Sequence, residues 1–322
     1  MASAAHVPVM AQQVADLLAP ALEAEGAVLV DATLGRAGHA RALLDAHPGL
    51  ALIGVDMDPD AIEESRRLLS RYGARVTLVH ARYDELPEIL AGLGLMQVQG
   101  VLFDLGVSSP QLDDPARGFS LRLDGPLDMR MDPDAGQSAA QWLARADLAE
   151  VRRVVREYGD ERFASSVAKA IVARQSAGRP VERTSDLAHV VASAIPVKDR
   201  KDPNQHPATR TFQALRIFIN QELEELALTL ETSVARMAPG ARLVVISFHS
   251  LEDRIVKRFI DLHAHPDRAM PRIPLRAAQL PAAMLRPLAR VRADPDEIAA
   301  NPRARSALMR VAERTGAPAP AT

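Results

Sequence analysis

The sequence predicts an α/β fold in which a sheet carries helices on both faces and is interrupted by an all-helical insertion. Over residues 27–104, short apolar runs alternate with segments of helical periodicity. After Asp104 this alternation stops, and from Ser138 to Ile195 every apolar pattern is helical. A β-branched run returns at 242–247. Because alternating strands and helices form a parallel, doubly wound sheet, we expect one sheet domain divided by a helical one.

The first part of the chain alternates regularly. A helix with apolar residues at Val14, Leu18 and Leu22 is expected to end near Gly26. Further helices are predicted through Leu43–Leu44, from Pro59 and around 86–90, with proline at a favoured helix start. The strands between them, each a short apolar run with β-branched residues, are predicted at 27–31, 50–55, 76–79 and 99–104.

The rest of the chain is expected to hold the insertion and the end of the sheet. Residues 113–133 are rich in Gly, Pro, Asp and Arg, which indicates an ordered loop. Helices are expected around Trp142 and at 151–158, 163–175, 187–194, 212–237 and 251–262, and strands at 242–247 and 307–312. Residues 264–295 allow no prediction. We therefore expect a sheet domain of 1–112 and 210–314, an inserted domain of 113–209 and a flexible tail of 315–322.

Composition excludes several classes of function. The chain has 322 residues and a net charge of −2, so no overall basic field favours a non-specific nucleic-acid binder. It has no cysteine, which excludes disulfides, thiolate metal sites and the thiol nucleophile used to methylate carbon 5 of cytosine. The longest run without a charged residue, Ile89–Phe103, has 15 residues, fewer than the ~18 of a membrane span. A cytoplasmic protein is expected.

A glycine-containing turn after the first predicted strand indicates a ligand site. Such turns let backbone N–H groups and a helix N-terminus approach a polar ligand closely. The order Gly35, Ala37, Gly38 does not fit the Gly-x-Gly-x-x-Gly of dinucleotide folds, which disfavours a nicotinamide-dependent dehydrogenase. Asp31, just before the turn, suits an ammonium group better than a pyrophosphate.

Two more acids end the following strands. Asp56 lies 21 positions after Gly35 (56 − 35), the spacing of an acid that accepts hydrogen bonds from ribose hydroxyls, although it could also be a helix cap. Asp104 ends the fourth strand, and Tyr83 follows the third, where it could lie beside adenine or be an ordinary half-buried tyrosine. Because the strand ends meet at one sheet edge, the three acids are expected to line one site. A nucleoside with an amino-acid tail would use all three, so S-adenosylmethionine is the predicted cofactor.

The stretch Asp104–Asp113, reading DLGVSSPQLD, closely resembles the signature of the RsmH (MraW) family. The resemblance implies a class I, Rossmann-like S-adenosylmethionine methyltransferase sheet with a helical insertion. It also implies methylation of the N4 amine of one cytidine in the decoding region of 16S rRNA, within the small ribosomal subunit. Further blocks that carry the resemblance are 117–120, 124–132, 158–159, 206–214, 246–254 and 301–306.

Cofactor contacts are carried over from the family by position. Together with Gly35 of the turn, the expected contacts are Ala37, Gly38, His39, Asp56, Tyr83, Asp104 and Gln111. The chain departs from the family at three positions, with Ala37 for the usual glycine, Ala40 for serine and Tyr83 for phenylalanine. We expect Ala37 to leave the turn usable if its φ is negative.

The chemistry on the acceptor side is less specific. The proton of the target amine is expected to pass to Asp104, our candidate catalytic residue, or to a backbone carbonyl of 108–110. An extruded base needs stacking partners, for which Phe119, Phe212 and Phe248 are candidates, unless they are simply core residues. RNA phosphates are expected at Arg117, Arg122 and Arg210, supported by Arg130, Lys198, Arg200 and Lys201. Because Asp199 and Asp202 dilute the positive charge of that loop, an ordinary solvated surface is the alternative.

Other interpretations stay open from the residues alone. His206 and His249 lack companions at ligand spacing, so no metal is expected. A non-catalytic factor that binds RNA or the ribosome is disfavoured by the three acids. Methylation of DNA or of a ribose is disfavoured only by the family resemblance. Oligomeric state and the choice between naked rRNA and the assembled subunit are not predicted.

Overall fold

The structure, a computed structural model, describes residues 8–197, 206–269 and 282–318. The chain forms two compact units. The first, which we call the sheet unit, comprises Met1–Gly106 and Leu223–Thr322, and the second, the inserted unit, comprises Val107–Glu222. The inserted unit is longer at both ends than the expected insertion of 113–209.

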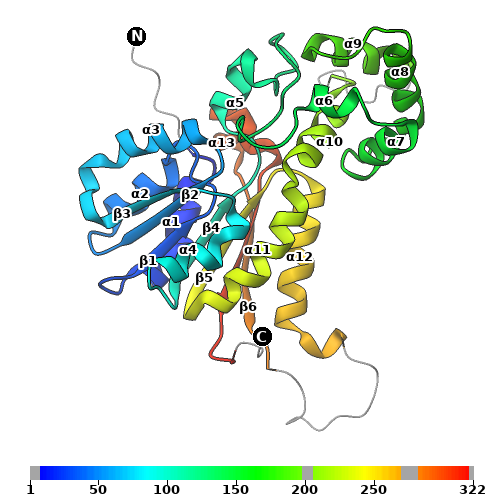
Figure 1. The fold of residues 1–322 in the computed structure, drawn as a ribbon. Coiled ribbons are helices and arrows are strands. Elements are labelled where there is room, and N and C mark those ends of the chain that lie inside the picture. Colours follow the sequence, from blue (N-terminus) through cyan, green and yellow to red (C-terminus); the bar gives the residue numbers. More distant parts are fainter. Residues whose placement is uncertain (1–7, 198–205, 270–281, 319–322) are drawn as a thin grey trace. The chain divides into compact units, whose positions relative to one another are not determined.

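The sheet unit is built on a seven-stranded sheet in the order β3-β2-β1-β4-β5-β7-β6 (Figure 1). β1 to β5 pair in parallel, as the alternation of strands and helices predicts, and β7 runs antiparallel to both of its neighbours. The strands are β1 Val28–Asp31, β2 Ala51–Asp56, β3 Val76–His80, β4 Val98–Asp104, β5 Met237–Ser247, β6 Leu285–Arg292 and β7 Leu308–Arg314.

Helices cover both faces of this sheet, as expected of a doubly wound fold. On one face, the apolar sides of α1 (Ala11–Leu22), α2 (Gly38–Ala46) and α3 (Pro59–Leu69) enter one buried cluster. On the other, α4 (Leu86–Gly92), α11 (Glu222–Arg236) and α12 (Ser250–Ala264) enter a second cluster. The short helix α13 (Pro295–Ala300) precedes β7.

The predicted helix starts have a local physical cause. The carboxylate of Asp58 accepts a hydrogen bond from the backbone N–H of Asp60 at 3.1 Å, and Pro59 occupies the first turn, where its missing N–H is not needed. Gly26 follows α1 with a φ of 76°, a left-handed conformation that suits glycine.

The inserted unit is helical within the part of the chain that the structure describes. α7 packs against α8 and α10, and α8 against α9. Capping boxes start three of its helices, with Ser108 and Gln111 at α5, Ser138 and Gln141 at α6, and Asp147 and Glu150 at α7. The helices are α5 Ser109–Asp113, α6 Ala139–Leu143, α7 Leu148–Glu157, α8 Ala164–Ser176, α9 Thr184–Ala194 and α10 Thr209–Asn220.

The expected single helix of 212–237 is wrong. The chain forms α10 and α11 instead, divided at Gln221, whose φ of 54° is left-handed. β5 also begins at Met237 rather than at 242, so Pro239 and Gly240 lie within the strand, where its pairing with β4 is irregular. β6 occupies part of the segment for which no prediction was possible.

Among the described residues no helix is long and apolar enough to cross a membrane. The backbone N–H of Thr315, the first residue of the expected tail, donates to the carbonyl of Met284 at 3.0 Å. Residues 319–322 lie outside the described residues.

Candidate active site

Three carboxylates end three neighbouring strands of the sheet unit at the same edge. Asp31 is the last residue of β1, where it is in register with Gly54 and Leu102. Asp56 and Asp104 each lie two positions further along β2 and β4. Parallel strands present their carboxyl ends together, so the spacing that the sequence predicted becomes one cluster of acids.

These acids hold the turn between β1 and α2. Asp56 Oδ2 accepts a hydrogen bond from the backbone N–H of Gly35 at 2.8 Å, and Asp56 Oδ1 accepts one from the N–H of Asp58 at 2.9 Å. The hydroxyl of Ser65 donates to the carbonyl of Gly35 at 2.8 Å. The conformation of the glycine turn is therefore fixed from β2 and α3.

Thr33 connects the first acid to the third. Its backbone N–H donates to Asp31 Oδ1 at 3.3 Å, and its hydroxyl oxygen accepts a hydrogen bond from the backbone N–H of Asp104 at 2.6 Å. Thr33 and Ser65 were not predicted as site residues. Hydroxyl side chains of this kind follow no periodic pattern, so only the folded arrangement identifies them.

Ala37 has a left-handed backbone conformation. It is the N-cap of α2 with φ 55° and ψ 31°, and it is fully buried. The condition of a negative φ is therefore not met. An L-residue in this region is strained by roughly 1–2 kcal/mol, which glycine would not be. The turn is nevertheless formed, with Gly35 also left-handed at φ 51°.

His39, in the first turn of α2, lies beside the catalytic candidate. Its imidazole is buried, and Nε2 lies 3.5 Å from Oδ2 of Asp104, whose side chain is 26% exposed. Burial lowers the pKa of His39, but the adjacent Asp104 carboxylate and the charge of Asp31 raise it, and the net pKa lies above its ordinary value. A cationic imidazole is thus stabilised between two acids.

The two other acids are hard to ionise. Burial raises the pKa of Asp31 to about 7, although the charge of His39 and the N–H of Thr33 lower it. Burial also raises the pKa of Asp56 to about 6, against the hydrogen bonds from Asp58 and Gly35. A ligand that brings positive charge or hydrogen-bond donors to this edge would stabilise the ionised carboxylates.

Tyr83 and Gln111, two further expected cofactor contacts, lie in different units of the chain. Tyr83 starts a 3-10 turn after β3, and its ring meets that of Phe103 edge-on, with centroids 5.9 Å apart. It therefore lies beside the end of β4. Gln111 belongs to the inserted unit, where it is buried and its Oε1 accepts the N–H of Ser108 at 2.9 Å in the capping box of α5.

The turn between β5 and α12 adds Glu252, which sequence reasoning missed. Glu252 is 2% exposed, and its Oε2 accepts the backbone N–H groups of Phe248 at 2.7 Å and His249 at 3.3 Å. His249 Nε2 lies 3.0 Å from Glu252 Oε1. A methyl group on Gly106, just after β4, would lie 3.6 Å from the Phe248 ring. Glu252 therefore fixes the turn beside the end of β4.

Of the three phenylalanines considered for base stacking, only Phe248 is half-buried. Phe119 and Phe212, both in the inserted unit, are buried. Phe248 thus retains a surface for a ligand, whereas the other two are core residues in this structure.

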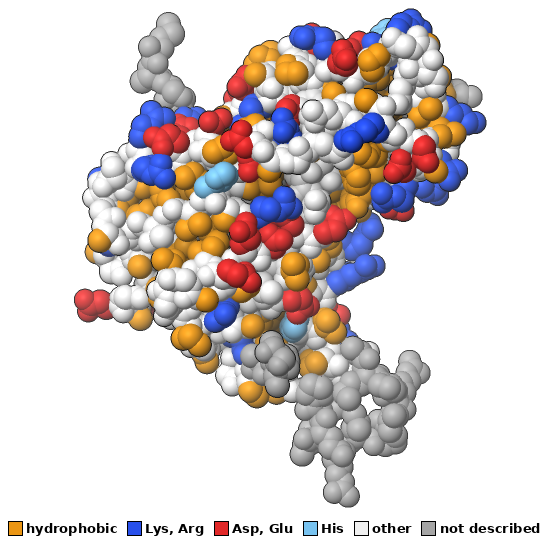
Figure 2. All heavy atoms as spheres, in the orientation of Figure 1, with side chains coloured by type: hydrophobic (Ala, Val, Ile, Leu, Met, Phe, Trp, Pro, Cys, Tyr) orange, Lys and Arg blue, Asp and Glu red, His pale blue; other side chains and the backbone are white. Residues whose placement is uncertain are grey.

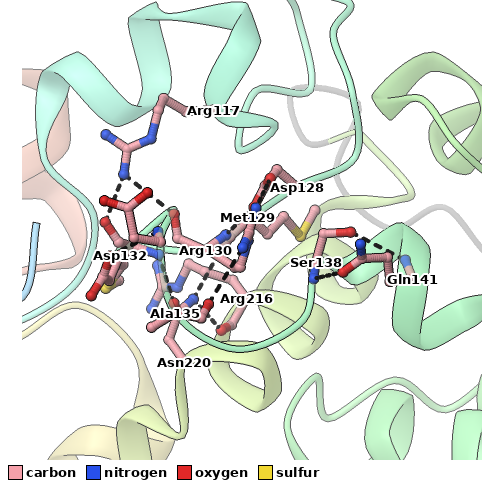
Figure 3. A network of polar contacts seen from close by, with 12 residues as sticks. Arg117, Asp128, Met129, Arg130, Asp132, Ala135, Ser138, Gln141, Arg216 and Asn220 are labelled. Atoms are coloured by element: carbon pink, nitrogen blue, oxygen red, sulfur yellow. Dashed lines mark hydrogen bonds and ion pairs between the residues drawn. The ribbon is translucent and has the colours of Figure 1, made fainter.

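Part of the expected arginine surface is used within the inserted unit (Figure 3). Arg117 Nη2 donates to the carbonyls of Arg130 at 3.2 Å and Met131 at 2.7 Å. Arg130 makes a two-point ion pair with Asp128, with both N···O distances 2.8 Å. These arginines order the loop that follows α5, which leaves less of them for RNA.

Asn220, the last residue of α10, closes the same network. Its Oδ1 accepts the N–H of Met131 at 2.7 Å, and its Nδ2 donates to the carbonyls of Met129 and Arg216 at 2.8 Å each (Figure 3). The left-handed Met129, φ 64°, is held in this way. The loop is therefore rigid although it has little regular structure.

Arg122 and Arg210 are exposed. Arg210 Nη1 donates to the carbonyl of Asp160 at 3.0 Å, and Arg122 has no polar side-chain partner among the described residues. Lys198, Arg200 and Lys201 lie outside the described residues. Within the described part of the chain, no group of three or more His, Asp or Glu side chains is placed to hold a metal ion.

Comparisons with known proteins agree over nearly the whole chain. A model of the MraW methylase family matches residues 3–315. The ribosomal RNA small subunit methyltransferase H of Aromatoleum aromaticum is 56% identical over 313 residues, which cover 95% of this chain and 97% of that protein. The protein of the same name from Leptothrix cholodnii is 51% identical, with 98% and 95% covered.

Solved structures resemble the chain more weakly. An rRNA methylase from Streptococcus thermophilus aligns over 97% of this chain and 99% of its own, with 10% sequence identity and a TM-score of 0.43. A similarity of this size supports no argument about the present chain.

Proposed function

The chain belongs to the MraW methylase family, and from this premise we propose that it methylates the N4 amine of a cytidine in the decoding region of 16S rRNA. Its methyl donor is S-adenosylmethionine. The names of the relatives support the small-subunit rRNA as substrate, and the signature DLGVSSPQLD supports the cytidine amine. The observation that carries the proposal is the cluster of Asp31, Asp56 and Asp104 around the glycine turn.

The residues at this edge fit the cofactor. Asp31 is buried with its pKa raised to about 7, and an ammonium group beside it would stabilise its ionised form. Asp56, already fixed by backbone N–H groups, has lone pairs left for ribose hydroxyls. Oδ1 of Asp104 and Nδ1 of His39 are buried without a hydrogen-bond partner among the described residues. Buried polar atoms of this kind require a partner, which a polar ligand would supply.

The chemistry is a direct displacement. When bound, S-adenosylmethionine would supply the methyl group, and its carbon–sulfur bond would break, with the electron pair left on sulfur, as the bond to the amine nitrogen forms. Asp104 is proposed to accept the proton that the amine loses, with a carbonyl of 108–110 as the alternative. His39 would then act as a positioning residue, because its imidazole fixes the Oδ2 side of the carboxylate. Alignment of the amine nitrogen with the methyl carbon would contribute further to the reaction rate.

The inserted unit is proposed to recognise the substrate. Arg122 and Arg210 are exposed cations suited to phosphate contacts, while Arg117 would act mainly by ordering the loop 117–131. On the family resemblance, we also propose Gln111 as a cofactor contact. We expect the enzyme to act in the cytoplasm, on rRNA within the small ribosomal subunit.

The test is methyl incorporation from labelled S-adenosylmethionine into small subunits from cells that lack the enzyme, followed by nucleoside mass spectrometry. N4-methylcytidine is the expected product. Label in a ribose or at carbon 5 of cytosine would reject the target atom, and no label with intact cofactor binding would reject the substrate.

The role of Asp104 needs a separate variant. Asp104→Asn keeps the size of the side chain but removes its capacity to take a proton. It is expected to lower kcat at least ~100-fold, a common contribution of a general base, with a smaller effect on cofactor affinity. Full turnover in Asp104→Asn would assign the proton to a backbone carbonyl.

A further inference from the structure

The outer face of α12 carries three exposed basic residues. Arg254, Lys257 and Arg258 are spaced i, i+3 and i+4, so they lie on one side of the helix, opposite the side that packs on the sheet through Val256 and Phe259. None of the three forms an ion pair or a side-chain hydrogen bond with another described residue. Figure 2 shows Lys and Arg side chains at the margin of the molecule where Figure 1 draws α12.

The edge strand β6 adds two more cations on the same side of the sheet. Arg310 of β7 points toward α12, because it forms an ion pair with Asp253 of that helix at 2.6 Å. Arg290 is directly opposite Arg310 in the antiparallel register, so it shares that face, and Arg292 follows two positions later. Arg290 and Arg292 are exposed and have no polar side-chain partner among the described residues.

The two acids of α12 nearest to these residues are each held by another arginine. Asp253 is held by two contacts to Arg310, at 2.6 and 3.1 Å. Asp261, one turn beyond Arg258, is paired with Arg268 at 2.7 Å. Placing Arg290 opposite Arg310 sets like charges across a strand pair, which is destabilising unless an anion is close. Asp253 satisfies only one of the two guanidinium groups.

The five cations begin at the edge of the sheet that holds the site. Arg292 is in register with Leu308, which pairs with Ser247 at the end of β5. Ser247 follows Ile246, the partner of Asp104. Three strand spacings therefore separate Arg292 from Asp104, roughly 14 Å at about 4.8 Å each. From this edge the basic residues continue along α12 and β6.

We propose that Arg254, Lys257, Arg258, Arg290 and Arg292, here called the α12–β6 strip, bind backbone phosphates of the RNA strand that carries the target base. The inference rests on the proposed function. A chain with a net charge of −2 needs a local site of this kind to hold a polyanion, since the affinity for RNA comes largely from neutralised phosphates. Such phosphate contacts would position the RNA strand in the enzyme but would not recognise its base sequence.

Salt dependence provides the test. Arg254→Gln/Lys257→Gln and Arg290→Gln/Arg292→Gln each remove two charges. If both residues of a pair contact phosphates, the slope of log affinity against log salt falls by about 1.4. Between about 50 and 200 mM salt, the KM of the unaltered enzyme for small subunits should therefore rise roughly sevenfold more than that of either variant. The KM of each variant should be several-fold higher at the lower salt concentration.

The matched control is Arg66→Gln/Arg67→Gln, which removes two exposed charges from α3. Its KM and salt slope should equal those of the unaltered enzyme, and all variants should bind S-adenosylmethionine equally. Strip variants that behave like this control would overturn the inference while the proposed function stands. Normal binding of protein-free rRNA with weakened binding of subunits would also overturn it, because the strip would then contact a ribosomal protein. Failure of the unaltered enzyme to form N4-methylcytidine would instead reject the proposed function.

Discussion

The buried carboxyl of Asp31 should make the stability of the ligand-free protein fall as the pH rises, and Asp31→Asn tests this. Asp31 is 2% exposed and burial raises its pKa to about 7, from an ordinary value of 3.8. A raised folded-state pKa means that the protonated carboxyl favours the fold. Its contribution is complete below the unfolded pKa and is lost as the pH rises through 7. A shift of about 3 units corresponds to about 4 kcal/mol.

The measurable part of this contribution lies between pH 5 and pH 8. With these two pKa values, protonation of Asp31 contributes about 2.5 kcal/mol more to folding at pH 5 than at pH 8. Asp56, whose pKa is raised to about 6, adds a smaller change of the same sign in both proteins. The difference between the unaltered protein and Asp31→Asn therefore reports Asp31 together with its charge coupling to His39 and Asp56.

The assay is urea unfolding of both proteins at the two pH values without cofactor. The unaltered protein should lose more stability between pH 5 and pH 8 than Asp31→Asn, by about 2.5 kcal/mol. Asp16→Asn, which alters an exposed carboxyl of α1, should behave like the unaltered protein. Equal losses in the unaltered protein and Asp31→Asn would show that Asp31 ionises normally and would refute the reasoning.

Three further predictions follow from the site and the inserted unit. His39→Gln removes a positive charge that lowers the pKa of Asp31. The pH at which the protein loses stability should therefore rise in the same urea experiment. An unchanged pH dependence would contradict the charge coupling between His39 and Asp31. Glu252→Gln keeps the shape but weakens the acceptor of two backbone N–H groups, so thermal unfolding should show a loss of about 1–3 kcal/mol, and an unchanged Tm would contradict this. Gly118→Ala would place a methyl group against the backbone carbonyl of Pro126, at a left-handed φ of 75°. Limited proteolysis should then cut the loop 117–131 faster, and equal cleavage rates would count against a rigid loop.

The sequence predicted those strands and helices whose apolar residues follow a clear pattern. β1, β2 and β4 were found within one or two residues, because each is a short apolar run ended by an acid. The break at Gln221 was missed because apolar spacing continues across it and glutamine gives no sign of a left-handed residue. β6 was missed because Pro287 and the exposed arginines of this edge strand interrupt the alternation of apolar and polar residues that would indicate a strand.

The candidate site was predictable to the extent that it depends on strand ends. Asp31, Asp56 and Asp104 could be identified from position alone. Thr33 and Glu252 could not, because their roles arise from hydrogen bonds to backbone groups distant in sequence or in a turn. The conformation of Ala37 could not be predicted, since only the fold decides the sign of φ at a small residue.

The division of the sheet unit between two chain segments has a consequence for synthesis on the ribosome. β4 is complete at Asp104, but β5, its neighbour in the sheet, begins only at Met237. At about 5–20 residues per second, roughly 7–26 s pass between them. During that interval β4 is an apolar strand with an unpaired edge, a state prone to aggregation. We expect a nascent chain arrested within the inserted unit to bind chaperones more strongly than one arrested after β7.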